Sequence, residues 1–227
     1  MKLWLVVSNL NNLLPYLSRP INLIIIFSIV YVFSLPPFGV SVFYYISFSI
    51  IYYNILTNDN FSKKYIFYFF LFTQIITLSW ITQSFYSGGF GYLFLGIILV
   101  GVLSIFIAFL HYSATILILV TFKKKLLQIF LLPLGLSIVE ILKEFIFGGF
   151  PWNPSAIIYY KNIWILKSLP FLGVYGLGLV VHLIVGLIIY FLYHKNKVVT
   201  FSLSLVLVLI YAFGFFENNY ERKTNNE

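Results

Sequence analysis

Long runs of apolar residues constrain the fold of this chain more than any other feature. One run covers residues 92–121 without a charged side chain, and an α-helix needs only about 20 residues to cross a bilayer. Charged residues make up 9% of the chain, whereas soluble domains carry about 25%. Membrane barrels use alternating segments of about 10 residues, so these continuous runs predict an all-α, polytopic membrane helical bundle.

The apolar runs predict about seven transmembrane helices. They cover residues 21–35, 40–56, 65–82, 92–121, 126–147, a stretch within 169–193, and 198–215. The fourth run exceeds the thickness of a bilayer, so we expect it to tilt or protrude. The chain is therefore divided into an interfacial segment (1–20), a seven-span domain (21–216) and a polar tail (217–227).

Basic residues are distributed unevenly over the loops. Seven spans with a cytoplasmic N-terminus place most of them inside: Lys2, Arg19, Lys63, Lys64, Lys123, Lys124, Lys125, Lys195 and Lys197. Lys161, Arg222 and Lys223 then lie on the outer face, and Lys167 lies in an interfacial stretch before the sixth span. This bias follows the positive-inside rule and predicts an external C-terminus. It also accounts for the net charge of +8, so no nucleic-acid partner is expected.

Three ionisable residues interrupt the fifth run. Glu140, Lys143 and Glu144 have the i, i+3, i+4 spacing that places them on one helix face. Ionisable residues inside a membrane are costly and mark candidate functional sites. Two interpretations follow: an internal ion pair that fixes helix packing, or a site for a polar lipid headgroup near the outer leaflet.

The segment Gly148-Gly149-Phe150-Pro151-Trp152 comes directly after this helix. Glycine commonly ends a helix, and proline prevents its continuation. A re-entrant turn buried in protein is the alternative. Trp152, with Tyr159 and Tyr160, also fits an interfacial aromatic belt.

The sequence predicts no catalytic residue, metal site or cofactor. The chain has no cysteine, which excludes a thiolate nucleophile or thiolate metal ligand within it. Its only aspartate, Asp59, falls in a loop, so no Ser-His-Asp triad is apparent. His111 and His182 lie in apolar runs and are expected to make hydrogen bonds between helices.

The charged helix and the turn after it resemble a known signature. Glu140 and Lys143, followed by Gly149-Phe150-Pro151-Trp152, resemble the Glu-Trp-Leu-Arg…Gly-Phe-Pro-Trp pattern of apolipoprotein N-acyltransferase, with Lys143 in place of its arginine. Three further segments fall in the family's order: Leu35-Pro36-Pro37-Phe38-Gly39, Trp80 with Gly88-Gly89, and Gly173-Val174-Tyr175-Gly176.

The resemblance implies a role in bacterial lipoprotein maturation at the inner membrane. That family transfers an acyl chain from a phospholipid to the N-terminal diacylglyceryl-cysteine of lipoproteins, on the periplasmic side. A nitrilase-like domain with a Glu-Lys-Cys triad performs the chemistry. This chain is expected to lack that domain, and thus to be half of a split enzyme that works with a separate nitrilase-like chain, or an inactive truncated form.

Within this resemblance, one set of residues is expected to form the portal for lipid substrates: Glu140, Lys143, Gly149, Phe150, Pro151 and Trp152. Glu140 and Lys143 would contact the headgroup, and the aromatic and proline residues would shape the opening. The rival interpretation is a small transporter or channel in which Glu140, Lys143 and His182 line a polar path.

Overall fold

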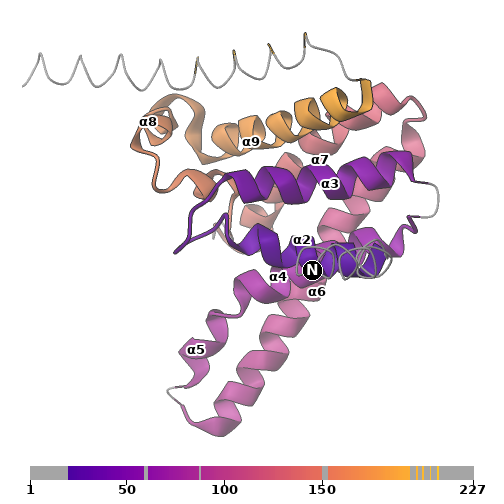
Figure 1. Cartoon of the computed structure of the whole chain (residues 1–227). Coiled ribbons are helices and arrows are strands. Elements are labelled where there is room, and N and C mark those ends of the chain that lie inside the picture. Colours follow the sequence, from indigo (N-terminus) through magenta and orange to yellow (C-terminus); the bar gives the residue numbers. More distant parts are fainter. Residues whose placement is uncertain are drawn as a thin grey trace, which may run out of the picture.

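The chain folds into a bundle of helices (Figure 1). The computed structural model describes residues 20–58, 61–86, 88–149 and 153–194, with isolated positions at 198, 201, 205 and 209. Every regular element within these ranges is a helix, which confirms the all-helical prediction.

The helices follow one another through short connections. In order they are α2 (Pro20–Val32), α3 (Val42–Thr57), α4 (Lys64–Leu78), α5 (Ile81–Tyr86), α6 (Phe90–Thr121), α7 (Lys125–Ile146), the 3₁₀ helix η1 (Ser155–Tyr159), α8 (Ile163–Leu166) and α9 (Leu169–His194).

Three of these helices, α6, α7 and α9, are long and apolar enough to cross a membrane. The helices α2, α3 and α4 are apolar but contain 13, 16 and 15 residues. At 1.5 Å per residue they extend about 20–24 Å, less than the roughly 30 Å hydrocarbon core. The structure therefore does not confirm seven spans. The expected seventh run, 198–215, lies outside the described residues except at the isolated positions.

The helix α7 packs closely against α9. A Cβ atom on Gly186 of α9 would lie 3.0 Å from Pro133 Cγ and 3.1 Å from the Ile129 carbonyl oxygen of α7. Both distances are shorter than ordinary van der Waals contact, so glycine favours this close approach, as expected for small residues between membrane helices. The helix α3 packs on α9 from another side, and α4 and α6 complete the bundle.

The helix α6 extends beyond the rest of the molecule. It contains 32 residues, or about 48 Å of helix. Its first half runs beside α5 as an arm that projects away from the other helices (Figure 1). Apolar side chains on the arm are exposed, among them Phe90 at 85% and Phe94 at 63%. The expected tilt or protrusion of this run relative to a bilayer stays a prediction.

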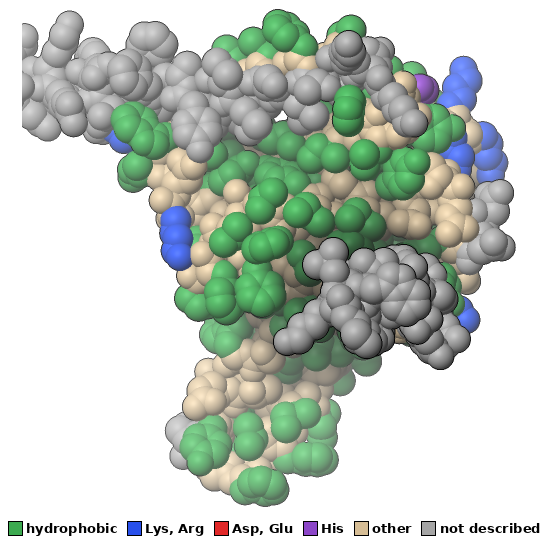
Figure 2. Space-filling model, in the orientation of Figure 1, with side chains coloured by type: hydrophobic (Ala, Val, Ile, Leu, Met, Phe, Trp, Pro, Cys, Tyr) green, Lys and Arg blue, Asp and Glu red, His purple; other side chains and the backbone are tan. Residues whose placement is uncertain are grey.

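Basic side chains gather at two opposite ends of the body, with hydrophobic side chains between them (Figure 2). One end carries the loop before α4 and Lys123–Lys125 before α7. The other end carries the turn between α2 and α3 and the segment 153–168. Lys161 of this segment joins the two by donating hydrogen bonds to the Pro37 and Phe38 carbonyls.

A buried polar cluster as the candidate functional site

The buried face of α7 carries two charged residues. Glu140 and Lys143 lie one helical turn apart and are only 6% and 3% exposed. Glu144 is half-buried. The side chains of Glu140 and Lys143 therefore point into the bundle.

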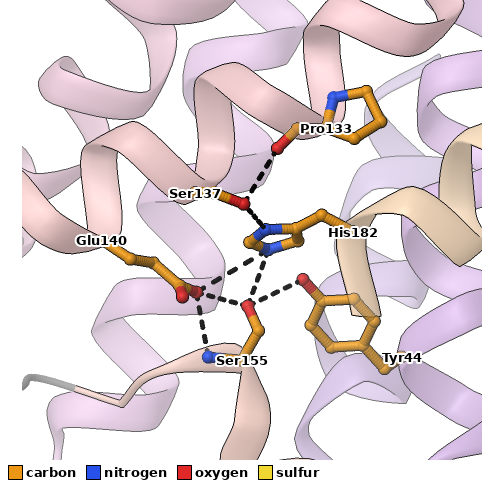
Figure 3. A network of polar contacts seen from close by, with 6 residues as sticks. All are labelled: Tyr44, Pro133, Ser137, Glu140, Ser155 and His182. Carbon is orange, nitrogen blue, oxygen red and sulfur yellow. Dashed lines mark hydrogen bonds and ion pairs between the residues drawn. The ribbon is translucent and has the colours of Figure 1, made fainter. Parts of the chain in front are cut away.

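Ser155 at the start of η1 holds the Glu140 carboxylate (Figure 3). Its backbone N–H donates to Glu140 Oε1 at 2.9 Å, and its hydroxyl donates to the same oxygen. The hydroxyl also contacts His182 Nε2 at 2.7 Å and the Tyr44 hydroxyl at 3.1 Å. A hydroxyl offers one proton and two lone pairs, so these three contacts use its full capacity.

These contacts assign the hydrogen-bond direction at His182. Because Ser155 donates its proton to Glu140, its oxygen accepts from His182 Nε2–H. The other ring nitrogen, Nδ1, lies 2.8 Å from the Ser137 hydroxyl and accepts from it in the neutral ring. The single Ser137 proton then goes to His182, so Ser137 does not also donate to the Pro133 carbonyl, whose oxygen lies 3.3 Å away. Such a network ties η1, α7 and α9 together.

The position of Ser155 shows that the chain turns back into the bundle after α7. Glu140 lies six residues before the end of α7 at Ile146, or about 9 Å along the helix axis. Ser155 bonds to it, and Ser155 is itself 5% exposed. The segment that begins at Asn153 therefore returns to the depth of Glu140, which supports the re-entrant interpretation.

Glycine ends α7 as the sequence predicted. Gly148 has φ of +67° and Gly149 has φ of +92°. The Gly149 N–H donates to the Glu144 carbonyl at 2.8 Å, which is the six-to-one bond of a Schellman motif. The next predicted portal residues, Phe150, Pro151 and Trp152, lie outside the described residues. Tyr159, assigned to an interfacial belt, is instead buried at 6% and bonds to the Tyr45 hydroxyl.

A small cavity adjoins the cluster. Its volume is about 20 Å³, enough for about one water molecule. Polar side chains from several elements line it, including Thr73, Gln74, Glu140, Lys143, Asn153, Ser155 and His182. Glu140 Oε2 has no hydrogen-bond partner among the described residues. A Cβ on Gly178 would lie 2.9 Å from that oxygen, so glycine at this position makes room for the carboxylate.

The two buried histidines behave differently. His182 bonds to Ser137 and Ser155 on other elements, which confirms the predicted hydrogen bond between helices. His111 also lines the cavity, but its Nδ1 bonds to the Ile107 carbonyl of its own helix at 2.9 Å. Its ring stacks on Phe70 with centroids 4.7 Å apart. The prediction of an interhelical bond is therefore wrong for His111, because a backbone acceptor one turn away was available.

The Ser155–His182–Glu140 arrangement differs from a catalytic triad. In a triad the carboxylate orients the histidine through Nδ1, whereas Glu140 lies on the Nε2 side, 3.7 Å away. Ser137 occupies Nδ1 instead. The adjoining cavity also has no room for an ester substrate. Among the described residues, no group of three His, Asp or Glu side chains is placed to hold a metal ion. The geometry favours a positioning role for this cluster.

Three members of the cluster were not predicted from the sequence: Tyr44, Ser137 and Ser155. Serine and tyrosine are frequent throughout the chain, so neither type marked its own position. The usable signal was indirect: a buried carboxylate requires donors, and Lys143 alone does not supply all those that the Glu140 carboxylate can accept.

Comparison with known protein families identified the family of this chain. The family described as the apolipoprotein N-acyltransferase N-terminal domain matches residues 27–187, which is more than half of the chain. The matched range contains Tyr44, Glu140, Ser155 and His182. Comparison with curated proteins gave no significant match.

Proposed function

The chain belongs to the apolipoprotein N-acyltransferase N-terminal domain family, and from this membership we propose that it is the membrane part of a lipoprotein N-acylation system. Its substrates are a phospholipid acyl donor and a diacylglyceryl lipoprotein. The observation that carries this proposal is the family match, which includes the whole buried polar cluster.

The acyl-transfer chemistry itself is assigned to protein outside these 227 residues. The family's reaction passes through a cysteine thioester, and no cysteine is present here. The cluster supplies no substitute, since its serine is enclosed beside a cavity of about 20 Å³. We propose that a nitrilase-like catalytic domain is supplied by another protein segment or chain. An inactive form is the competing possibility, and the activity assay below distinguishes the two.

The proposed location is the bacterial inner membrane, with Lys123–Lys125 on the cytoplasmic side. Basic residues lie at both ends of the bundle, but Lys63, Lys64 and Lys123–Lys125 at one end outnumber Lys161 and Lys167 at the other. Such an excess of positive charge marks the cytoplasmic side and favours this orientation. It directs the turn after α7, the portal residues and Lys161 towards the periplasm. Seven spans with a periplasmic C-terminus belong to the same proposal.

The lipid portal is proposed at Glu140, Lys143, Gly149, Phe150, Pro151 and Trp152. The bonds from Ser155 to Glu140 connect the residues before this turn to those after it. The buried cluster therefore holds both ends of the portal segment. Glu140 anchors the segment, and Lys143, one helical turn away on α7, provides a positive charge for the headgroup.

A transporter or channel is less consistent with the geometry. Glu140, Lys143 and His182 do meet at one cavity, but its volume is about 20 Å³ and aromatic side chains such as Tyr44 and Phe70 close it. Substrate-dependent flux in proteoliposomes would favour this alternative.

The test of the proposed function is reconstitution. The chain is placed in vesicles of phosphatidylethanolamine with a nitrilase-like domain, and a diacylglyceryl lipopeptide is added. Mass spectrometry is expected to show N-acylated lipopeptide only when both proteins are present. If the domain neither binds the chain nor gains activity from it, the proposal fails.

The portal assignment has its own test within that assay. Lys143→Ala and Trp152→Ala are expected to reduce cross-linking of a photoactivatable phospholipid to the chain. Lys64→Ala and Trp80→Ala are matched controls, since both residues are exposed and distant in sequence from the portal. Equal cross-linking in all four variants would show that the portal lies elsewhere.

A further inference from the structure

A second, larger groove lies outside the polar cluster. Its volume is about 420 Å³, within the roughly 300–1,000 Å³ typical of small-molecule sites. The turn between α2 and α3 forms one wall, and residues 158–164 form the other. Since this segment follows the end of α7, it lies at the opposite end of that helix from Lys125. None of the cluster residues lines the groove.

Among the residues that the structure describes, Lys161 is the only charged one that lines the groove. Its ammonium donates to the Pro37 carbonyl at 2.9 Å and to the Phe38 carbonyl at 2.8 Å. It also lies 5.4 Å from the centre of the Tyr160 ring, and the Tyr160 hydroxyl donates to Pro37 at 2.6 Å. These contacts hold the ammonium of this groove-lining residue in place, although the side chain is exposed.

These contacts leave the positive charge intact. Carbonyl oxygens are dipoles and do not neutralise a unit charge, and no carboxylate of the described part of the chain lines the groove. An ammonium has three N–H donors, and the two carbonyls use two of them. One donor therefore remains for an anionic ligand. Ser41 and Asn162 add polar groups to the lining, and Trp164 adds an indole, a side chain typical of the membrane–water interface.

We propose that this groove binds the phosphate group of a phospholipid headgroup. A fixed cation beside hydrogen-bonding groups fits a phosphate, and tryptophan at the rim fits the depth at which headgroups lie. The site is separate from the portal, and it requires neither acyl transfer nor a catalytic partner.

The experiment compares lipid retention by the full chain in detergent, measured by native mass spectrometry. The probes are phosphatidylglycerol and diacylglycerol, which lacks the phosphate. Lys161→Gln is expected to weaken phosphatidylglycerol binding by about tenfold, as for the loss of one charge-assisted hydrogen bond. Lys167→Gln is the matched control, because Lys167 follows on the same segment but does not line the groove. Diacylglycerol binding should be weak, and neither substitution should change it.

Two further variants separate binding from folding. Lys161→Arg keeps the charge and should retain the lipid. Ser41→Leu narrows the groove and should weaken binding, and Ser41 makes no capping hydrogen bond whose loss would disturb α3. Competition by free glycerol phosphate would show that the phosphate alone suffices, whereas lipid binding without competition would show that the whole lipid is required. Equal phosphatidylglycerol retention by Lys161→Gln and Lys167→Gln would overturn the proposal.

Discussion

Replacing Ser155 with alanine tests the buried cluster directly. The substitution removes the hydroxyl that contacts Glu140, His182 and Tyr44, while the backbone bond to Glu140 at 2.9 Å remains. It leaves the donors on His182 and Tyr44 without their acceptor inside the bundle. The cluster should then lose its connection between α3, η1 and α9.

The expected loss of stability follows from the three contacts. Hydrogen bonds between membrane helices contribute about 0.6 kcal/mol each on average, which sets a lower figure of about 2 kcal/mol. The two buried donors left unsatisfied, on His182 and Tyr44, cost about 1–3 kcal/mol each. This raises the expected loss in the free energy of unfolding to about 4 kcal/mol. For a chain of this size 1 kcal/mol shifts Tm by about 2–4 °C, so Ser155→Ala should lower Tm by at least about 4 °C.

The assay is thermal unfolding of the purified chain in detergent, with Ser104→Ala as the matched control. Ser104 is fully buried in α6, and its hydroxyl has no hydrogen-bond partner among the described residues. Removing it should leave Tm unchanged or raise it, because an unsatisfied buried hydroxyl is lost. If the two alanine variants shift Tm equally, the cluster does not stabilise the fold and the reasoning is refuted.

Two more predictions use the same preparation. Gly178→Ala should lower Tm, because the new Cβ would lie 2.9 Å from Glu140 Oε2. The control Gly101→Ala places its Cβ where no neighbour lies within 4 Å, so it should be neutral or stabilising by about 0.5–1 kcal/mol. Equal effects of the two substitutions would contradict the packing around the carboxylate. Because the chain has no cysteine, single Lys124→Cys and Lys161→Cys variants report orientation in intact cells. An impermeant thiol reagent should label only the second, and the reverse pattern would refute the proposed topology.

The class of the protein follows from the sequence alone. Hydrophobicity and charge act through composition, so the run at 92–121 and the scarcity of charge were sufficient to predict a membrane helical bundle. The end of α7 was also predicted from the sequence, because glycine commonly ends a helix, and Gly148 and Gly149 do so with positive φ. The resemblance at Glu140, Lys143 and Gly149–Trp152 also identified the family that the comparison found.

Helix lengths were less well predicted, because apolar character continues through turns. The run at 65–82 reads as one span, yet α4 ends at Leu78 and Trp80 is 58% exposed. Hydropathy does not register such a break in backbone hydrogen bonding.

Only the tertiary structure decided what Glu140 contacts. The sequence left open an internal ion pair or a headgroup site, since spacing reveals partners only within one helix. The structure shows that Ser155, fifteen residues away, bonds to the carboxylate and that His182 of α9 joins them. Long-range hydrogen bonds depend on how helices pack, and close approach at Gly178 and Gly186 determines that packing. Composition and periodicity identified the bundle, but the meeting of three distant side chains required its fold.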